Sequence, residues 1–311
     1  MNSPPRQQCV PVSLTQGDCL LKDDSLGDGC PCELNKRYRY DHVIDDDHGH
    51  LKEYLGAFGS SFGQWLRAAT MRQAEKMVWH HRRSASCASK NRVPVPRKYR
   101  LHAAFRNQNQ DLWQKYSLVK TAITEECHGP SKGKTVMLPV EASSIEALEG
   151  EALDASINEW YLFHGSRPEA LSKILSSNFR LTLAGSGATW KDPGKACGVP
   201  LYGYGLYFAE RITKADEYAH PIQEGDPLPV DPGHESTFYA VLVCRVLGGR
   251  SNLVTTNEIE REKLRKDVFD GPFHSVFGDR VSSLGKPYKE VVVYDKDQTF
   301  PEYLLIYSRQ Y

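Results

Sequence analysis

The chain has 311 residues, of which 40% are hydrophobic, and its 39 basic residues balance its 39 acidic ones. A net charge of zero excludes a field over the whole molecule that would select an anionic partner. No stretch reaches the roughly 20 apolar residues of a membrane helix, and the N-terminus lacks the pattern of a secretory signal. We therefore expect no membrane partner and an intracellular location, in the nucleus, the cytoplasm or both. Eight scattered cysteines favour reduced thiols over a disulfide framework.

Residues 1–94 form an N-terminal region whose function the sequence does not indicate. Glycine, proline, serine and acidic clusters are mixed there, a composition typical of partial disorder. One segment, 62–79, has a helical pattern of apolar residues. Cys30 and Cys32 lie near three histidines, but structural zinc sites usually separate paired cysteines by two or more residues. We therefore expect no metal.

Two segments carry charge of a single sign. Residues 76–110 hold nine lysines and arginines and no carboxylate, whereas residues 141–159 hold six carboxylates and no basic residue. Runs of this density are common on ordinary surfaces, so we interpret both as solvated linkers. Nuclear import or nucleic-acid contact by the basic segment, and self-modification of the acidic one, stay open as alternatives. Nucleic acid is not the expected partner.

The first strong helical signal follows the basic segment. Asn109 is a suitable N-cap, and Leu112, Trp113, Tyr116 and Val119 fall on one apolar face. By composition alone this pattern predicts a helix that packs on a core. A long tether over about 127–157 then leads to the next element.

A short strand and a second helix are predicted next. The apolar run 160–163 ends at His164 and Gly165. Ser166 is the expected cap of the following helix, Pro168 suits its first turn, and Asn178 suits a left-handed ending.

The second half of the chain is rich in predicted strands. Residues 184–205 form a glycine-rich loop, and a strand over 206–209 follows it. Thr213 and Asp216 predict a capping box for a helix that contains Tyr218. Further β-branched or aromatic runs are bounded by turn residues, and they lie at 239–246, 290–295 and 303–307. Without regular βαβ alternation, this pattern predicts an α+β fold.

Three segments end apolar runs with a polar residue: Phe-His-Gly-Ser at 163–166, Gly-Tyr-Gly-Leu-Tyr-Phe-Ala-Glu at 203–210, and Tyr-Lys-Glu-Val-Val-Val-Tyr at 288–294. If their ends converge, a histidine, a tyrosine and a carboxylate face one ligand. In this order they resemble the His-Tyr-Glu signature of the poly(ADP-ribose) polymerase family. The segments at 108–116, 273–276 and 300–307 are also similar to that family.

The resemblance spans residues 95–311 and implies a catalytic domain with the family's fold: a split antiparallel β-sheet core with short flanking helices. It implies NAD⁺ as co-substrate, protein acceptors and no metal. It also assigns roles to single residues. The catalytic ones are Glu290, His164 and Tyr207, and those that bind NAD⁺ are His164, Gly165, Ser166, Arg180, Tyr207 and Tyr218.

The implied chemistry is cleavage of the bond between nicotinamide and ribose. That bond breaks through an oxocarbenium-like state, which a nearby carboxylate stabilises. In the resemblance, Glu290 accepts the hydroxyls of the nicotinamide ribose, while Tyr207 and Tyr218 stack on the nicotinamide ring. Gly165 offers its backbone to the carboxamide, and Arg180 suits the diphosphate or adenine side. His164 and Ser166 bind the adenosine ribose.

The chain departs from the family at two positions. Ala215 stands where a serine usually binds the nicotinamide amide, and Tyr204 stands where a lysine is common. The leading interpretation is an NAD⁺-dependent protein ADP-ribosyltransferase that adds single units or chains, including to itself. Two alternatives stay open: a non-catalytic protein that binds NAD⁺ or ADP-ribose, and an NAD glycohydrolase.

Overall fold

The computed structural model describes residues 51–53, 96, 98–129, 135–138, 140, 152–184, 199–230, 237–284 and 288–311. Several predictions fall outside these residues: the helix over 62–79, the cysteines near residue 30, and the part at 185–198 of the glycine-rich loop predicted over 184–205. Most of the basic and acidic segments lie outside them as well. These features stay predictions.

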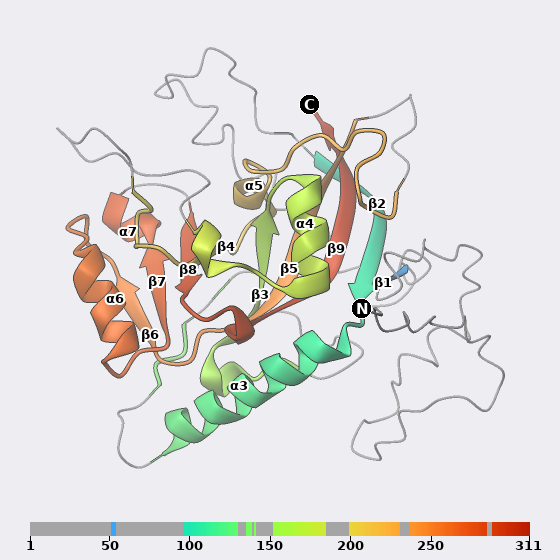
Figure 1. Ribbon diagram of the computed structural model, residues 1–311. Helices are drawn as coiled ribbons and strands as arrows, with labels where there is room; N and C mark the ends of the chain where they lie inside the picture. Colours follow the sequence, from blue (N-terminus) through green and yellow to red (C-terminus); the bar gives the residue numbers. More distant parts are fainter. Residues whose placement is uncertain are drawn as a thin grey trace, which may run out of the picture.

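The described strands are β1 (Leu51–Glu53), β2 (Lys98–Asn107), β3 (Glu159–Gly165), β4 (Leu206–Ala209), β5 (Phe238–Leu247), β6 (Ser251–Val254), β7 (Ser275–Asp279), β8 (Lys289–Val293) and β9 (Thr299–Gln310). They form one sheet in the order β1-β2-β9-β5-β3-β4-β8-β7-β6. Adjacent strands are antiparallel except β6 and β7, which are parallel. Figure 1 shows this sheet through the middle of the described part of the chain.

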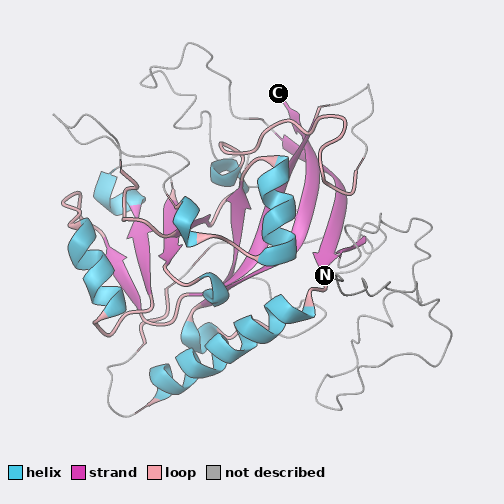
Figure 2. Cartoon of the chain, in the orientation of Figure 1, coloured by secondary structure: helices cyan, strands magenta, loops and turns pink. Residues whose placement is uncertain are grey.

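The described α-helices are α3 (Gln110–His128), α4 (Pro168–Ser177), α5 (Ile212–Ala215), α6 (Arg261–Phe269) and α7 (Arg280–Leu284). Short 3₁₀ turns are η5 (Ala155–Ile157), η6 (Leu181–Leu183) and η7 (Lys296–Gln298). Figure 2 shows that these helices flank the sheet, with the long α3 along the bottom of the view. The predicted α+β class is confirmed, although α3, at 19 residues, is longer than a short flanking helix.

The sheet is nearly divided between β3 and β4. β3 pairs with β5 along its whole length, from Glu159 to Gly165, whereas its register with β4 consists of the single pair Phe163 and Ala209. Four consecutive pairs then join β4 to β8. The described strands therefore form two well-paired groups that meet at a narrow junction, which agrees with the predicted split sheet.

The core lies on both faces of the central strands. β5 and β9 are buried almost without interruption rather than in alternation, which is typical of strands covered on both sides. Leu171 and Leu175 of α4 pack against this core, and burying one such side chain stabilises the fold by about 1.5–3 kcal/mol. α3 packs Leu112 and Tyr116 against Phe300 in a second cluster. The sequence prediction of a core helix is confirmed.

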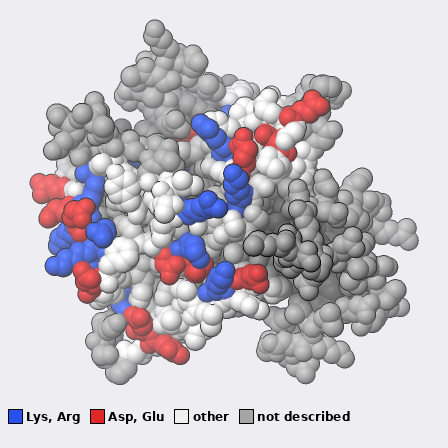
Figure 3. Space-filling view, in the orientation of Figure 1, with Lys and Arg blue, Asp and Glu red and all other residues white. Residues whose placement is uncertain are grey.

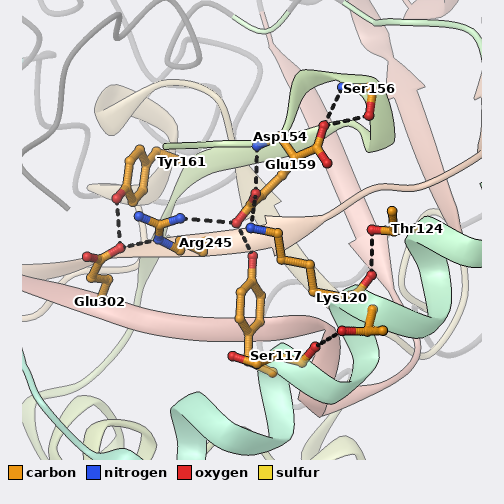
Figure 4. Close-up of polar contacts among 11 residues, drawn as sticks. Ser117, Lys120, Thr124, Asp154, Ser156, Glu159, Tyr161, Arg245 and Glu302 are labelled. Carbon is orange, nitrogen blue, oxygen red and sulfur yellow. Dashed lines mark hydrogen bonds and ion pairs between the residues drawn. The ribbon is translucent and has the colours of Figure 1, made fainter. Parts of the chain in front are cut away.

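A buried ionic network joins α3 to the sheet (Figure 4). Arg245 of β5 is 1% exposed and lies between two carboxylates, with its Nη1 3.2 Å from Glu159 Oε1 and its Nε 2.5 Å from Glu302 Oε2. Lys120 of α3 lies 3.1 Å from the second oxygen of Glu159. The Tyr161 hydroxyl donates to Glu302 at 2.7 Å. Each buried charge therefore has an opposite partner, without which its burial would be costly.

Two predicted helix ends are confirmed. The Asn109 side chain accepts a hydrogen bond from the Leu112 N–H at 3.2 Å, as an N-cap does. α4 ends at Asn178 as predicted, but the predicted left-handed conformation is wrong: φ is 67°, whereas ψ is 176° and lies outside the left-handed helical region.

Three other local predictions are wrong. The cap of α4 is Arg167, with no side-chain cap bond, because Pro168 occupies the first helical position and Ser166 lies one residue too early. The capping box of Thr213 and Asp216 does not form, because α5 begins at Ile212 and Asp216 lies at its end. Tyr218 lies after α5, in the turn that follows it, rather than within the helix.

Asp216 has a different role from the predicted one. Its side chain is fully buried and accepts hydrogen bonds from the hydroxyls of Tyr99 and Tyr307 and from Arg309 Nε, at 3.1, 2.5 and 2.8 Å. These partners come from β2 and β9. Asp216 thus anchors the end of α5 to β2 and β9, and so positions the start of the turn that carries Tyr218.

Candidate functional site

The three predicted segments lie side by side in the sheet. β3 carries His164 and Gly165 at its end, the adjacent β4 carries Tyr207, and β8, next to β4, carries Glu290. In the register, Ala209 lies opposite both Phe163 and Glu290. The site residues therefore gather at the narrow junction of the sheet.

Their side chains lie on different faces of the strands. Successive residues of a strand point to opposite faces, so Tyr207 and Glu290, two register positions apart, share one face. Tyr207 packs with Val292 on that side. His164 instead contacts the rings of Phe179 and Phe208, at centroid distances of 4.9 and 5.8 Å. The histidine is thus adjacent to the other two residues but oriented toward the main core.

The hydrogen bond of His164 defines its chemical state. Its Nδ1 lies 3.0 Å from the Tyr207 carbonyl oxygen, and a carbonyl only accepts, so Nδ1 carries the proton. Burial lowers the pKa of His164 below its ordinary value, an effect that the bond to Tyr207 partly opposes. The ring is therefore neutral near pH 7, and Nε2 is an acceptor. An acceptor here suits a ribose hydroxyl.

Glu290 lies between two cations. The carboxylate is 7% exposed, and its Oε1 accepts from Arg280 Nη1 at 2.7 Å and lies 3.6 Å from Lys214 Nζ. Burial by itself lowers the pKa of the Arg280 guanidinium, but its neighbours, first Glu290 and then Tyr202, together raise it above the ordinary value. The described residues thus hold a charged carboxylate at a nearly dry position, where its field on a developing cation is strong.

Lys214 connects the carboxylate to the tyrosine after α5. Its Nζ lies 3.0 Å from Glu217 Oε2 and 3.2 Å from the Tyr218 hydroxyl, and 5.0 Å from the centroid of that ring. Burial alone would lower the pKa of the ammonium, but its neighbours, first Tyr218 and then Glu217, raise it above the ordinary value. Lys214 therefore stays charged and holds Tyr218 close to Glu290.

The Tyr207 hydroxyl is engaged by the chain itself. It accepts a hydrogen bond from the Tyr202 N–H and donates one to the Gly203 carbonyl, each at 2.8 Å. Burial raises the pKa of the phenol well above its ordinary value, so the hydroxyl keeps its proton. Tyr207 is thus suited to presenting its ring rather than to proton transfer.

Gly165 meets Ala215 at the end of β3. A Cβ built on Gly165 would lie 1.9 Å from the Ala215 carbonyl oxygen, so no other residue fits without backbone movement. That oxygen accepts from the Tyr218 N–H at 3.0 Å. The structure therefore brings together Gly165, Tyr218 and the position where the family usually has a serine.

Ser166 and Arg180 lie at the margin of this group. Ser166 is half-buried, and its hydroxyl has no hydrogen-bond partner among the described residues. Arg180 is exposed and follows Phe179, whose ring packs on His164. The polar group of Ser166 and the exposed side chain of Arg180 are thus both accessible to a ligand.

The described residues include no group of three or more histidine, cysteine, aspartate or glutamate side chains that could hold a metal ion. None of the helices described has the length and apolar character that crossing a bilayer requires.

On the face in Figure 3, basic and acidic side chains are intermixed. At α6, for example, Lys263 pairs with Asp267 at 2.6 Å and Arg265 with Glu262 at 3.6 Å.

A split α+β sheet that carries a histidine, a tyrosine and a glutamate on three adjacent strands is the arrangement expected of an ADP-ribosyltransferase. Residues 81–309, most of the chain, match the family model for the poly(ADP-ribose) polymerase catalytic domain. The chain therefore belongs to the poly(ADP-ribose) polymerase family, whose catalytic domains use NAD⁺ as substrate. The predicted domain start at residue 95 stays a prediction.

Sequence reasoning missed three residues of this group. Lys214 lies between Thr213 and Asp216, which predicted a capping box, and its spacing to Tyr218 indicates no contact with β8. Arg280 lies between the segments at 273–276 and 288–294, outside every segment that resembles the family. Phe179 follows the helix end predicted at Asn178, and no local pattern marks it as a site residue. A charged residue predicted to be buried is the one signal that could have marked Lys214.

Proposed function

We propose that this protein is an NAD⁺-dependent protein ADP-ribosyltransferase. It releases nicotinamide and attaches ADP-ribose to side chains of protein acceptors, its own chain among them. The observation that carries the proposal is the environment of Glu290: a carboxylate 7% exposed, held by two cations, on the strand beside Tyr207. Membership of the family supports the same reading.

The proposed reaction exchanges one bond at the anomeric carbon of the ribose. The bond from that carbon to the nicotinamide nitrogen breaks, and the electron pair leaves with neutral nicotinamide. The acceptor oxygen then bonds to the same carbon and loses any proton that it carries to solvent or a base. Glu290 stabilises the positive charge that develops on the ribose and orients its hydroxyls.

Other residues bind NAD⁺ in this proposal. The neutral His164 accepts from a hydroxyl of the adenosine ribose through Nε2, and the Ser166 hydroxyl binds the same sugar. Arg180 pairs with the diphosphate or contacts the adenine side. Tyr207 and Tyr218 stack on the nicotinamide ring, and the Gly165 backbone binds its carboxamide. Since a stacked ring and a held carboxamide fix the leaving group, they favour bond cleavage at one position.

Ala215 favours one alternative, a protein that holds NAD⁺ without turnover. A serine at this position would add a hydrogen bond to the nicotinamide amide, worth about 1 kcal/mol. The Ala215 backbone lies against Gly165, where the carboxamide is proposed to bind. We favour the transferase because losing this hydrogen bond weakens NAD⁺ binding only several-fold, whereas Glu290, the residue proposed to stabilise the transition state, is present.

Incubation with NAD⁺ labelled in the adenylate part tests the proposal. We expect label on protein together with free nicotinamide, and loss of both in Glu290→Gln. Glu262→Gln is the matched control, since that side chain is 91% exposed on α6. Saturable NAD⁺ binding without nicotinamide release would refute the transferase and support the binding protein. Free ADP-ribose equal to nicotinamide, with unlabelled protein, would indicate a glycohydrolase.

Chain length is read from the same labelled protein. Phosphodiesterase digestion of single units yields AMP, whereas internal units of a polymer yield phosphoribosyl-AMP. The acidic segment 141–159 is the first place to look for self-modification, because it carries six carboxylates. If peptide mapping of the labelled protein finds no label in this segment, its role as acceptor is refuted.

A further inference from the structure

Arg280 lies directly after β7 and is placed there by a local turn. In the register of β7 and β8, Gly278 lies opposite Glu290 and Asp279 opposite Lys289. The Asp279 carboxylate accepts from the Val281 and Ser282 N–H groups, at 3.0 and 3.2 Å, which turns the chain into α7. The first residue of that turn is therefore held beside the strand that carries Glu290.

The space between the two side chains is shaped by a glycine. A Cβ on Gly278 would lie 2.2 Å from the ring of Tyr202, so that ring occupies the place of a side chain opposite Glu290. Arg280 is 4% exposed in these surroundings. Its guanidinium thus has little freedom to leave the carboxylate.

The contacts on Glu290 are unequal. Both cations act on Oε1: Arg280 Nη1 at 2.7 Å and Lys214 Nζ at 3.6 Å. Oε2 has no hydrogen-bond partner among the described residues. A carboxylate held by one oxygen presents the other in a fixed direction, which is what a hydrogen bond to a ribose hydroxyl requires.

Arg280 is not arranged for the greatest stability. Its Nε is buried and has no hydrogen-bond partner among the described residues, and a buried unpaired donor destabilises a fold. Groups left so at a site are commonly retained for function. We propose that Arg280 is a positioning residue for the transfer reaction: it holds Oε1 of Glu290 and so directs Oε2 to the ribose hydroxyls of NAD⁺. The inference rests on the transferase proposed above.

The test is a kinetic comparison of the full chain with three variants: Arg280→Gln, Glu290→Gln and the double variant. Nicotinamide release from NAD⁺ is measured at several NAD⁺ concentrations. For Arg280→Gln we expect kcat to fall roughly 10- to 100-fold, because a misdirected carboxylate loses orientation, while KM changes by less than about threefold. Arg265→Gln is the matched control, a surface arginine 59% exposed on α6.

The double variant separates positioning from a direct or structural role. If Arg280 acts through Glu290, the double variant releases nicotinamide within about threefold of the rate of Glu290→Gln alone. If Arg280→Gln lowers the rate of nicotinamide release as much in the Glu290→Gln background as in the wild type, the inference is overturned. A native kcat in the single variant Arg280→Gln would overturn it as well. If the wild-type chain itself releases no nicotinamide, the proposed function fails, and the inference fails with it.

Folding is monitored by circular dichroism for each variant. If Arg280→Gln does not fold but the double variant does, the buried charge of Glu290 needs Arg280, which supports the coupling. If neither folds, Arg280 is a structural residue and the inference is overturned.

Discussion

Acidification should reveal the buried network around Glu302. This carboxylate, 1% exposed, binds Arg245, Arg106 and the Tyr161 hydroxyl. Burial alone would raise its pKa, but Arg245 and then Arg106 outweigh burial and lower the pKa to about 2 from an ordinary 4.5. One pKa unit corresponds to about 1.4 kcal/mol, so the charged form contributes about 3 kcal/mol to the free energy of unfolding.

The sign follows from which state binds the proton first. The pKa of Glu302 is lower in the folded state, so on acidification the unfolded chain takes up the proton first. The contribution is therefore complete above about pH 4.5 and is lost as the pH falls toward about 2.

Urea unfolding followed by tryptophan fluorescence, at intervals from about pH 7 to about pH 3, measures this effect. In Glu302→Gln the share of the pH dependence that belongs to Glu302 should vanish, so its stability curve should be flatter than that of the wild type below pH 4.5. Glu262→Gln, an exposed control, should follow the wild type. Parallel curves for Glu302→Gln and the wild type would refute the reasoning.

Three further predictions concern the candidate site. Gly165→Ala should lower the free energy of unfolding by about 1–3 kcal/mol, seen as a lower Tm in thermal unfolding, and should also weaken NAD⁺ binding, because the new Cβ meets the Ala215 carbonyl oxygen. An unchanged Tm and affinity would contradict the contact. Affinity for a non-hydrolysable NAD⁺ analogue, measured by calorimetry, should fall on acidification, because protonation of His164 converts its Nε2 from acceptor to donor. Since burial lowers the pKa of His164, the fall should begin only below the ordinary pKa of histidine; a flat profile would count against that role. Tyr207→Phe should cost about 1–3 kcal/mol of stability, since the Tyr202 N–H loses its partner, yet keep the ring and most of the NAD⁺ affinity; loss of affinity with native stability would show instead that the hydroxyl binds substrate.

Local sequence patterns predicted many elements well. The strand over 206–209 matches β4, and the Asn109 cap and the apolar face of α3 are where the spacing indicated. These features depend on neighbours within a few residues, which the sequence displays directly. The capping box predicted at Thr213 is wrong because it was inferred from local spacing alone. α5 begins at Ile212, and Asp216 at its end binds three distant groups from β2 and β9, which no local motif could indicate.

The parts of the site that were missed depend on strand order. Arg280 and Glu290 are ten residues apart, but nothing between them states that their side chains meet. Lys214 reaches Glu290 across 76 positions because β4 pairs with β8 and α5 follows β4. Periodicity within one segment holds no information about such pairing.

The sequence by itself determined that the chain is α+β and that His164, Tyr207 and Glu290 each stand in a strand-like run in the order of the poly(ADP-ribose) polymerase family. The tertiary structure decided the relative positions of these residues and their ionic partners. It placed β3, β4 and β8 side by side, turned His164 to the opposite face from Tyr207, and put Arg280 and Lys214 on one oxygen of Glu290. The physical reason is that apolar period and caps are local properties, whereas face, burial and ionic partners arise only when distant strands pair.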